Sequence, residues 1–182
     1  MYYMMHCPDP EVGYLAMLDY DFSEDPDPLR DWMSADRFDE PPPLPVRVTV
    51  APRPNSVIGE MWQVPLPIMS KRLLETLTKG SVSNIDSYPL VFEMPDGSIR
   101  QDTHVAFNLI GKISTVAQRG YIKGGNELLG GVRLNEEAIG DALMFRLAES
   151  VNAIVVHDSI KAAIQAAGID TLQFIAPESW TG

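Results

Sequence analysis

Asp102 and His104 are the side chains whose types and spacing come nearest to a reaction centre. They stand two residues apart in a stretch with the pattern of a strand, so both could face one side of it. Such a pair is usable by a metal ion or in general-base catalysis. Either role needs a third partner, and without one a polar surface pair is the more ordinary explanation.

His157, Asp158 and Ser159 contain the three residue types of a hydrolytic triad. Neighbours on one strand-to-helix turn cannot face one another as a triad requires, so helix capping by Asp158 or Ser159 explains them better. Glu136 and Glu137 are adjacent carboxylates, which seldom converge, and the first turn of a helix favours acidic residues. Neither group predicts a catalytic centre.

The glycine-rich stretch GGNELLGG at 124–131 lacks both the lysine-plus-hydroxyl ending of a phosphate loop and the G-x-G-x-x-G spacing of a dinucleotide site. Cys7 is the only cysteine, which excludes an internal disulfide and favours a small buried hydrophobe. We therefore predict no catalytic residue, no metal and no cofactor. The alternative is a small enzyme or ligand-binding domain whose pocket no motif marks, starting from Asp102 and His104.

The dominant charge pattern is the acidic segment, residues 19–43, which reads DYDFSEDPDPLRDWMSADRFDEPPP. It holds nine acidic residues against two arginines, in a chain of 182 residues with a net charge of −11. Negative charge of this density repels nucleic acid and anionic lipid and attracts a basic partner. Either a partner surface or a solvated loop accounts for the segment. The candidate contact residues of a partner surface are Asp21, Glu24, Asp25, Asp27, Asp31 and Trp32.

The elements that would position these residues can be read from prolines, glycines and apolar periodicity. Pro26 and Pro28 prevent a regular helix or central strand across the acidic segment, while Trp32 and Phe38 should pin it onto the body by burying aromatic area. The alternation in PVRVTV at 45–50 predicts a half-buried strand. A helix should follow, beginning at Ser70 and ending at Gly80.

The second half of the chain predicts more strands than helices. YPLVFEMPDGSIR at 88–100 indicates a hairpin, and HVAFNLIGKISTV at 104–116 a long strand with a bend or bulge at Gly111. Strands at 142–147 and 152–157 precede a short helix that stops at Gly168, and TLQFIAP begins a last strand. This order favours an α+β fold with a mostly antiparallel or mixed sheet and few short helices. We expect one domain over residues 1–182, less regular at about 19–55.

Residues 141–180 carry a family resemblance. It rests on a strand ending in FRL at 145–147, the segment AIVV at 153–156, an Ala-rich helix followed by AGI at 167–169, and LQF at 172–174. This pattern resembles the C-terminal signature of an immunity-protein family of bacterial polymorphic toxin systems, first catalogued as a domain of unknown function and associated with a myxobacterial member. HVAFNLIGKIS at 104–114 and DWMSADRFDEPPP at 31–43 are more loosely similar to the family.

The resemblance implies an immunity protein that binds and neutralises a cognate protein toxin without catalysis of its own. The acidic charge would suit a basic toxin and disfavours nucleic acid. The apolar runs are shorter than a membrane span and the start lacks the features of a signal peptide, so we expect a cytoplasmic protein without a membrane partner. Homo-oligomer formation stays open, as does a structural or oligomeric accessory role.

Overall fold

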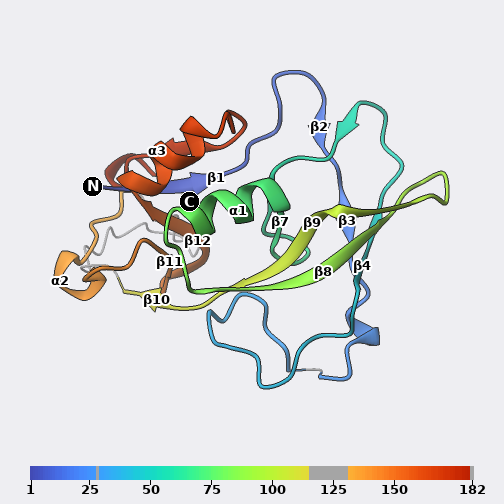
Figure 1. Ribbon diagram of the computed structural model, residues 1–182, viewed down its shortest axis with the longest axis horizontal. Helices are drawn as coiled ribbons and strands as arrows, with labels where there is room; N and C mark the ends of the chain where they lie inside the picture. The colour runs from blue at the N-terminus through green and yellow to red at the C-terminus, as the bar shows by residue number, and fades with distance from the viewer. Residues whose placement is uncertain (28, 115–130, 181–182) are drawn as a thin grey trace, which may run out of the picture.

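The computed structural model of the chain describes residues 1–27, 29–114 and 131–180 (Figure 1). Within these ranges strands dominate, in mixed and antiparallel sheets with three short α-helices, which confirms the predicted fold class. The two larger sheets are antiparallel except at one strand pair each, and short 3-10 helices lie at Phe22–Glu24 (η1) and Pro177–Ser179 (η2). The two larger sheets are therefore the framework on which a functional site would be positioned.

The larger sheet has six strands in the order β3-β4-β8-β9-β7-β6, with β4 and β8 parallel. β4 alternates buried and exposed residues along its length, as its valines predict. β8 and β9 form the expected hairpin, whose turn has Gly97 at a φ of 80°. The strands are β3 (Leu18–Asp19), β4 (Val46–Val50), β6 (Met61–Trp62), β7 (Ile68–Ser70), β8 (Ile85–Glu93) and β9 (Ile99–Leu109).

The second sheet has five strands in the order β10-β11-β12-β1-β13, with β10 and β11 parallel. The first strand of the chain lies between two of the last, because β1 pairs antiparallel with both β12 and β13. A separate parallel pair joins β2 (Tyr14–Leu15) to β5 (Ser56–Val57). The five strands are β1 (Tyr2–His6), β10 (Lys112–Ile113), β11 (Met144–Leu147), β12 (Ser150–His157) and β13 (Gln173–Ile175).

Gly111 connects the two sheets. The sequence predicts one long bent strand over 104–116, but the structure ends β9 at Leu109 and starts β10 at Lys112, in the other sheet. Gly111 has a φ of 100°, a conformation that residues with a Cβ rarely adopt, and the chain passes there from one sheet to the other. The prediction of a single strand was therefore wrong, although β9 does lie inside its sheet, between β8 and β7.

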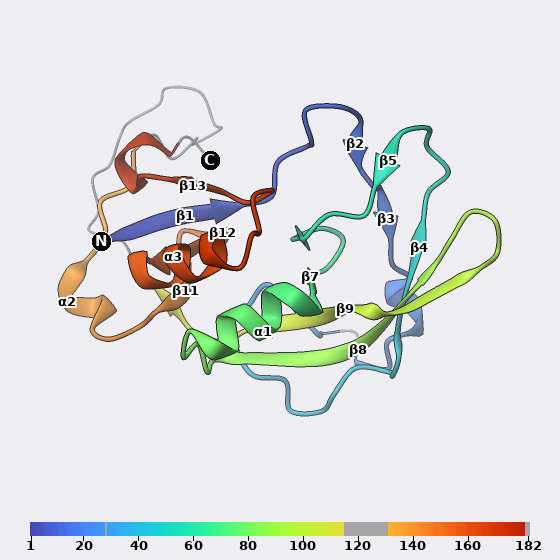
Figure 2. The ribbon, with the colours of Figure 1, turned by 45° about the horizontal axis from the view of Figure 1, so that its top comes forward.

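Helices α1 (Lys71–Lys79) and α3 (Asp158–Ala166) lie side by side between the sheets (Figure 2), and the four-residue α2 spans Glu136–Ile139. α1 begins and ends as predicted: the Ser70 hydroxyl accepts the Leu73 N–H at 3.0 Å, and Gly80 closes the last turn. The cap expected at Asp158 or Ser159 is instead His157, whose ring accepts the Ser159 N–H. The imidazole Nδ1 of His157 occupies the position that a carboxylate or hydroxyl oxygen usually takes.

Three clusters of buried side chains form the core. The central cluster joins α1 and α3 to the facing sides of both sheets, through Leu77, Ile164, Phe107 and Val156 among others. A second cluster lies on the other face of the six-stranded sheet, beneath the acidic segment, and a third lies on the outer face of the five-stranded sheet, beneath α2 and η2. The acidic segment and α1 therefore cover opposite sides of one sheet (Figures 1 and 2).

Candidate functional site

The structure separates Asp102 from His104. Asp102 is exposed and forms an ion pair with Lys71 at 3.4 Å, whereas His104 is buried against the rings of Trp62 and Phe92. The Gly59 carbonyl, 2.9 Å from Nε2, can only accept, so Nε2 carries the proton and Nδ1 accepts from the Thr103 hydroxyl. Burial lowers the pKa of His104 and keeps its ring neutral. The predicted pair is thus an exposed carboxylate and a core histidine whose two ring nitrogens are both hydrogen-bonded.

Trp32 holds the acidic segment on the six-stranded sheet. Its side chain is 3% exposed, and its ring makes T-shaped contacts with the rings of Phe38 and Tyr88 at 5.1 and 5.7 Å between centroids. Phe38 in turn stacks on Tyr88 of β8. The prediction that Trp32 and Phe38 anchor the segment is confirmed. Trp32 therefore supports the segment from beneath and offers almost no surface to a partner.

Arg30 fixes the first half of the segment from within. Its Nε donates to Asp25 at 2.6 Å, and both side chains are nearly buried, at 2% and 5% exposure. The same guanidinium donates to the carbonyls of Glu40 and Pro41 and lies over the Phe38 ring. Asp25 is consequently an internal ion-pair partner, and its carboxylate is covered rather than presented.

The second half of the segment is bonded to the turn between the two sheets. The Gly111 N–H donates to the Ala35 carbonyl at 2.8 Å, and the Lys112 ammonium donates to the Ser34 carbonyl at 2.9 Å. The buried Asn108 amide donates to the Asp36 carbonyl at 2.7 Å. These bonds join irregular backbone to β9 and β10, so the segment is attached at both halves.

The remaining candidate carboxylates lie at the surface of the segment. Asp21, Asp27 and Asp31 each accept a backbone N–H from the residue two positions on, at 2.8–3.0 Å, and Glu24 lies in η1. Each of the three aspartates thereby fixes its own turn while the side chain stays exposed. Four of the six candidate residues therefore present negative charge, and Trp32 and Asp25 do not.

Arg146 is a buried cation at the junction of the two sheets. It is 0% exposed, and its Nη1 donates to the Gln63 side chain at 3.0 Å and to the Val151 carbonyl at 2.5 Å. Within the part of the chain that the structure describes, its Nε and Nη2 have no hydrogen-bond partner. Burial lowers the pKa of Arg146 to about 10, an effect that the negative charge of Asp31 opposes. The guanidinium is thus charged at neutral pH.

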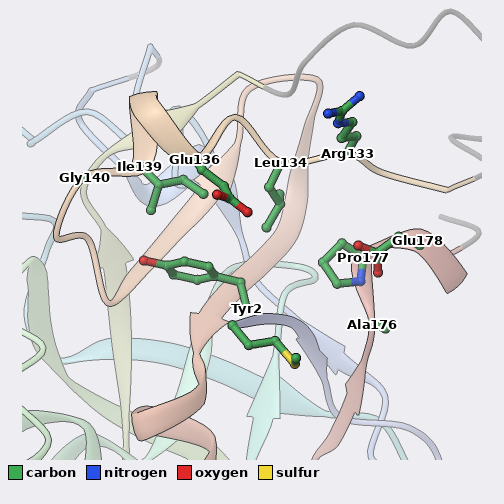
Figure 3. A pocket seen from close by; sticks show the side chains of 10 residues that line it. Tyr2, Arg133, Leu134, Glu136, Ile139, Gly140, Ala176, Pro177 and Glu178 are labelled. Carbon is green, nitrogen blue, oxygen red and sulfur yellow. The ribbon is translucent and has the colours of Figure 1, made fainter.

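A cavity of about 950 Å³ opens beside β1, α2 and η2 (Figure 3). Glu136 points toward Tyr2 across it, whereas Arg133 points away. The Tyr2 hydroxyl donates to the Ala142 carbonyl, and burial raises the pKa of Tyr2, so this phenol stays protonated at neutral pH. Cys7 lines a smaller cavity, where burial raises the pKa of its thiol. Neither group is thereby activated as a base or a nucleophile.

The chain matches no protein-family model, and a search of the curated proteins finds no similar sequence. Over residues 1–27, 29–114 and 131–180, no three His, Cys, Asp or Glu side chains are grouped so that they could hold a metal ion. In the same ranges, no helix has the length and apolar character needed to cross a membrane.

Sequence reasoning missed two exposed apolar residues in the acidic segment. Phe22 is 53% exposed and Leu29 is 88% exposed, whereas the tryptophan that the sequence singled out is buried. Size alone favoured Trp32 as a contact residue, and an irregular loop has no period that tells inward from outward side chains. GGNELLGG, the other stretch considered for binding, lies outside the described residues except for Gly131.

Proposed function

We propose that this chain is an immunity protein of the kind its C-terminal sequence resembles, which binds and neutralises a cognate protein toxin through the acidic segment. The observation that supports the proposal is the way this segment is held. The internal Arg30–Asp25 pair and the buried Trp32 attach it to the sheet, and eight of its nine acidic residues, all but Asp25, are exposed. A loop that is ordered before binding loses less conformational entropy in the complex than a free loop does.

The charge of the segment implies the chemistry of its partner. Asp21, Glu24, Asp27 and Asp31 are exposed on one short stretch, and Arg37, the second arginine of the segment, pairs with Asp86 of β8. A toxin surface rich in lysine and arginine would meet this charge with complementary sign. Such complementarity mainly accelerates association and selects the partner, and salt weakens it. Occlusion of the toxin requires no catalytic group in the immunity protein.

The first experiment is co-expression of the chain with the protein encoded beside it, scored for growth. The proposal expects the neighbour to be toxic alone and harmless with the chain, through a complex that the purified proteins also form. A neighbour that is not toxic, or whose toxicity the chain does not relieve, contradicts the proposal.

The second experiment tests the surface. A variant with Asp21→Asn, Glu24→Gln, Asp27→Asn and Asp31→Asn keeps the side-chain acceptors of the turns and removes four charges. Its matched control removes four exposed charges elsewhere: Glu75→Gln, Asp102→Asn, Glu137→Gln and Asp170→Asn. We expect the first variant to associate with the toxin roughly tenfold more slowly at low salt, and the control to change little. Equal rates for both variants would exclude the acidic segment as the contact surface.

A further inference from the structure

Phe22 and Leu29 stand out because the other large apolar residues of the acidic segment are buried or partly buried. Trp32 is 3% exposed and Phe38 packs on the sheet, whereas Phe22 and Leu29 are 53% and 88% exposed. Singly exposed apolar side chains are ordinary on protein surfaces, so what marks these two is their place among the exposed carboxylates of the segment. The segment therefore has an inner apolar set that attaches it and an outer apolar set that remains in solvent.

Hydrogen bonds to neighbouring residues fix both outer residues at their own backbone N–H or C=O groups. Asp21 caps η1 by accepting the Ser23 N–H at 2.9 Å, and the Asp25 N–H donates back to the Phe22 carbonyl at 3.3 Å. The Tyr20 ring meets the Phe22 ring edge to face at 4.8 Å between centroids. Phe22 therefore has a defined place on its turn while half of its surface stays accessible.

Leu29 is held in a similar way. Its N–H donates to Asp27 at 3.0 Å, and the next residue is Arg30, whose guanidinium is fixed in the buried pair with Asp25. The Leu29 side chain itself is almost fully exposed. Because the N–H groups of Leu29 and Arg30 both donate to Asp27, little backbone freedom is lost when a partner covers the Leu29 side chain.

We propose that Phe22 and Leu29 are the apolar anchors of the acidic segment, and that they insert into an apolar recess ringed by lysine or arginine on the toxin. This inference rests on the proposed function and specifies its partner surface. Exposed carboxylates flank both anchors, at Asp21, Glu24 and Asp27. Charge complementarity then requires cations around the recess, while the anchors supply the affinity that exposed charges do not.

The same charges argue against two other occupants. A second copy of the chain would bring another segment with nine acidic residues against two arginines onto the first, and like charges repel. An anionic membrane surface would be repelled for the same reason. A basic protein is therefore the occupant that the surface fits.

The test is the dissociation constant of the toxin complex for Phe22→Ala and Leu29→Ala, with the proteins used at full length. Val64→Ala and Ile99→Ala are matched controls, because they remove exposed apolar side chains outside the acidic segment. We expect each anchor variant to weaken binding about 30-fold or more, through faster dissociation that changes little with salt. The controls should bind within about twofold of the wild type. Both anchor side chains are exposed, so circular dichroism should show all four variants folded.

The outcomes separate this inference from the proposed function. If the wild type binds the toxin and the anchor variants bind like the controls, the anchors are wrong and the immunity function stands. If the wild type does not bind at all, the proposed function fails and the inference fails with it. If size-exclusion chromatography shows a dimer that Phe22→Ala dissociates, the occupant is a second copy and the inference is overturned.

Discussion

Arg30→Met tests whether the buried ion pair attaches the acidic segment. The substitution removes the charged partner of Asp25 and the donors to the Glu40 and Pro41 carbonyls, in a place where both side chains of the pair are at most 5% exposed. Breaking a buried pair from one side typically costs about 3–5 kcal/mol, because the other charge is left without compensation. We therefore expect the free energy of unfolding to fall by about 3 kcal/mol, or the segment to detach locally at a smaller global cost.

Urea unfolding followed by circular dichroism measures the first outcome, and hydrogen exchange of the segment amides measures the second. Arg47→Met is the matched control, since Arg47 pairs with Glu93 at 3.1 Å with both side chains about half exposed, and such pairs contribute at most about 1 kcal/mol. Adding Asp25→Ala to Arg30→Met should restore part of the loss by removing the uncompensated charge. The reasoning is refuted if Arg30→Met costs no more than Arg47→Met and leaves hydrogen exchange in the segment unchanged.

Three further changes test other parts of the structure. Arg146→Ala should cost at least about 2 kcal/mol more in urea unfolding than Arg146→Met, because methionine keeps the buried volume and alanine leaves a cavity; equal costs would contradict the burial of Arg146. The free energy of unfolding of the wild type should fall as the pH drops through about 6.5, because His104 is protonated there in the unfolded chain but not in the folded protein, where its pKa is lowered. The His104→Gln variant should lose less stability over the same pH range. Gly13→Ala should lower the free energy of unfolding by about 1–3 kcal/mol, because Gly13 has a φ of 94° and the new Cβ would overlap the Asn55 carbonyl. Gly97→Ala should cost less, because Gly97 also has a positive φ, of 80°, but its Cβ would meet open space.

The elements that could be predicted are those whose sequence carries a local period or a local cap. The valines of β4 are all buried and alternate with the exposed Arg47 and Thr49. Ser70 and Gly80 bound α1 because a hydroxyl and a glycine satisfy the ends of a helix within a few residues. The division of β9 and β10 between two sheets was not predictable, because strand partners are chosen by distant residues. The pattern on either side of Gly111 fits one strand or two equally well.

The candidate site also has a part that the sequence predicts and a part that it does not. That Trp32 and Phe38 anchor the acidic segment followed from their size among acidic residues. The pairing of Arg30 with Asp25 could not be foreseen, since five positions of irregular backbone set no common face. For the same reason the sequence could not separate Asp25, whose carboxylate is covered, from Asp21, Asp27 and Asp31, whose carboxylates stay exposed.

The place of β1 between β12 and β13 sets the order in which the protein can be completed during synthesis. The first strand leaves the ribosome long before either partner exists, and Met4 and Met5, buried on its two faces, have no sheet to cover them until the last strands emerge. The six-stranded sheet needs no strand beyond β9, so it can form while the chain is still being made. The five-stranded sheet closes only afterwards, and until then the nascent chain exposes an unpaired apolar strand that chaperones would have to protect from aggregation.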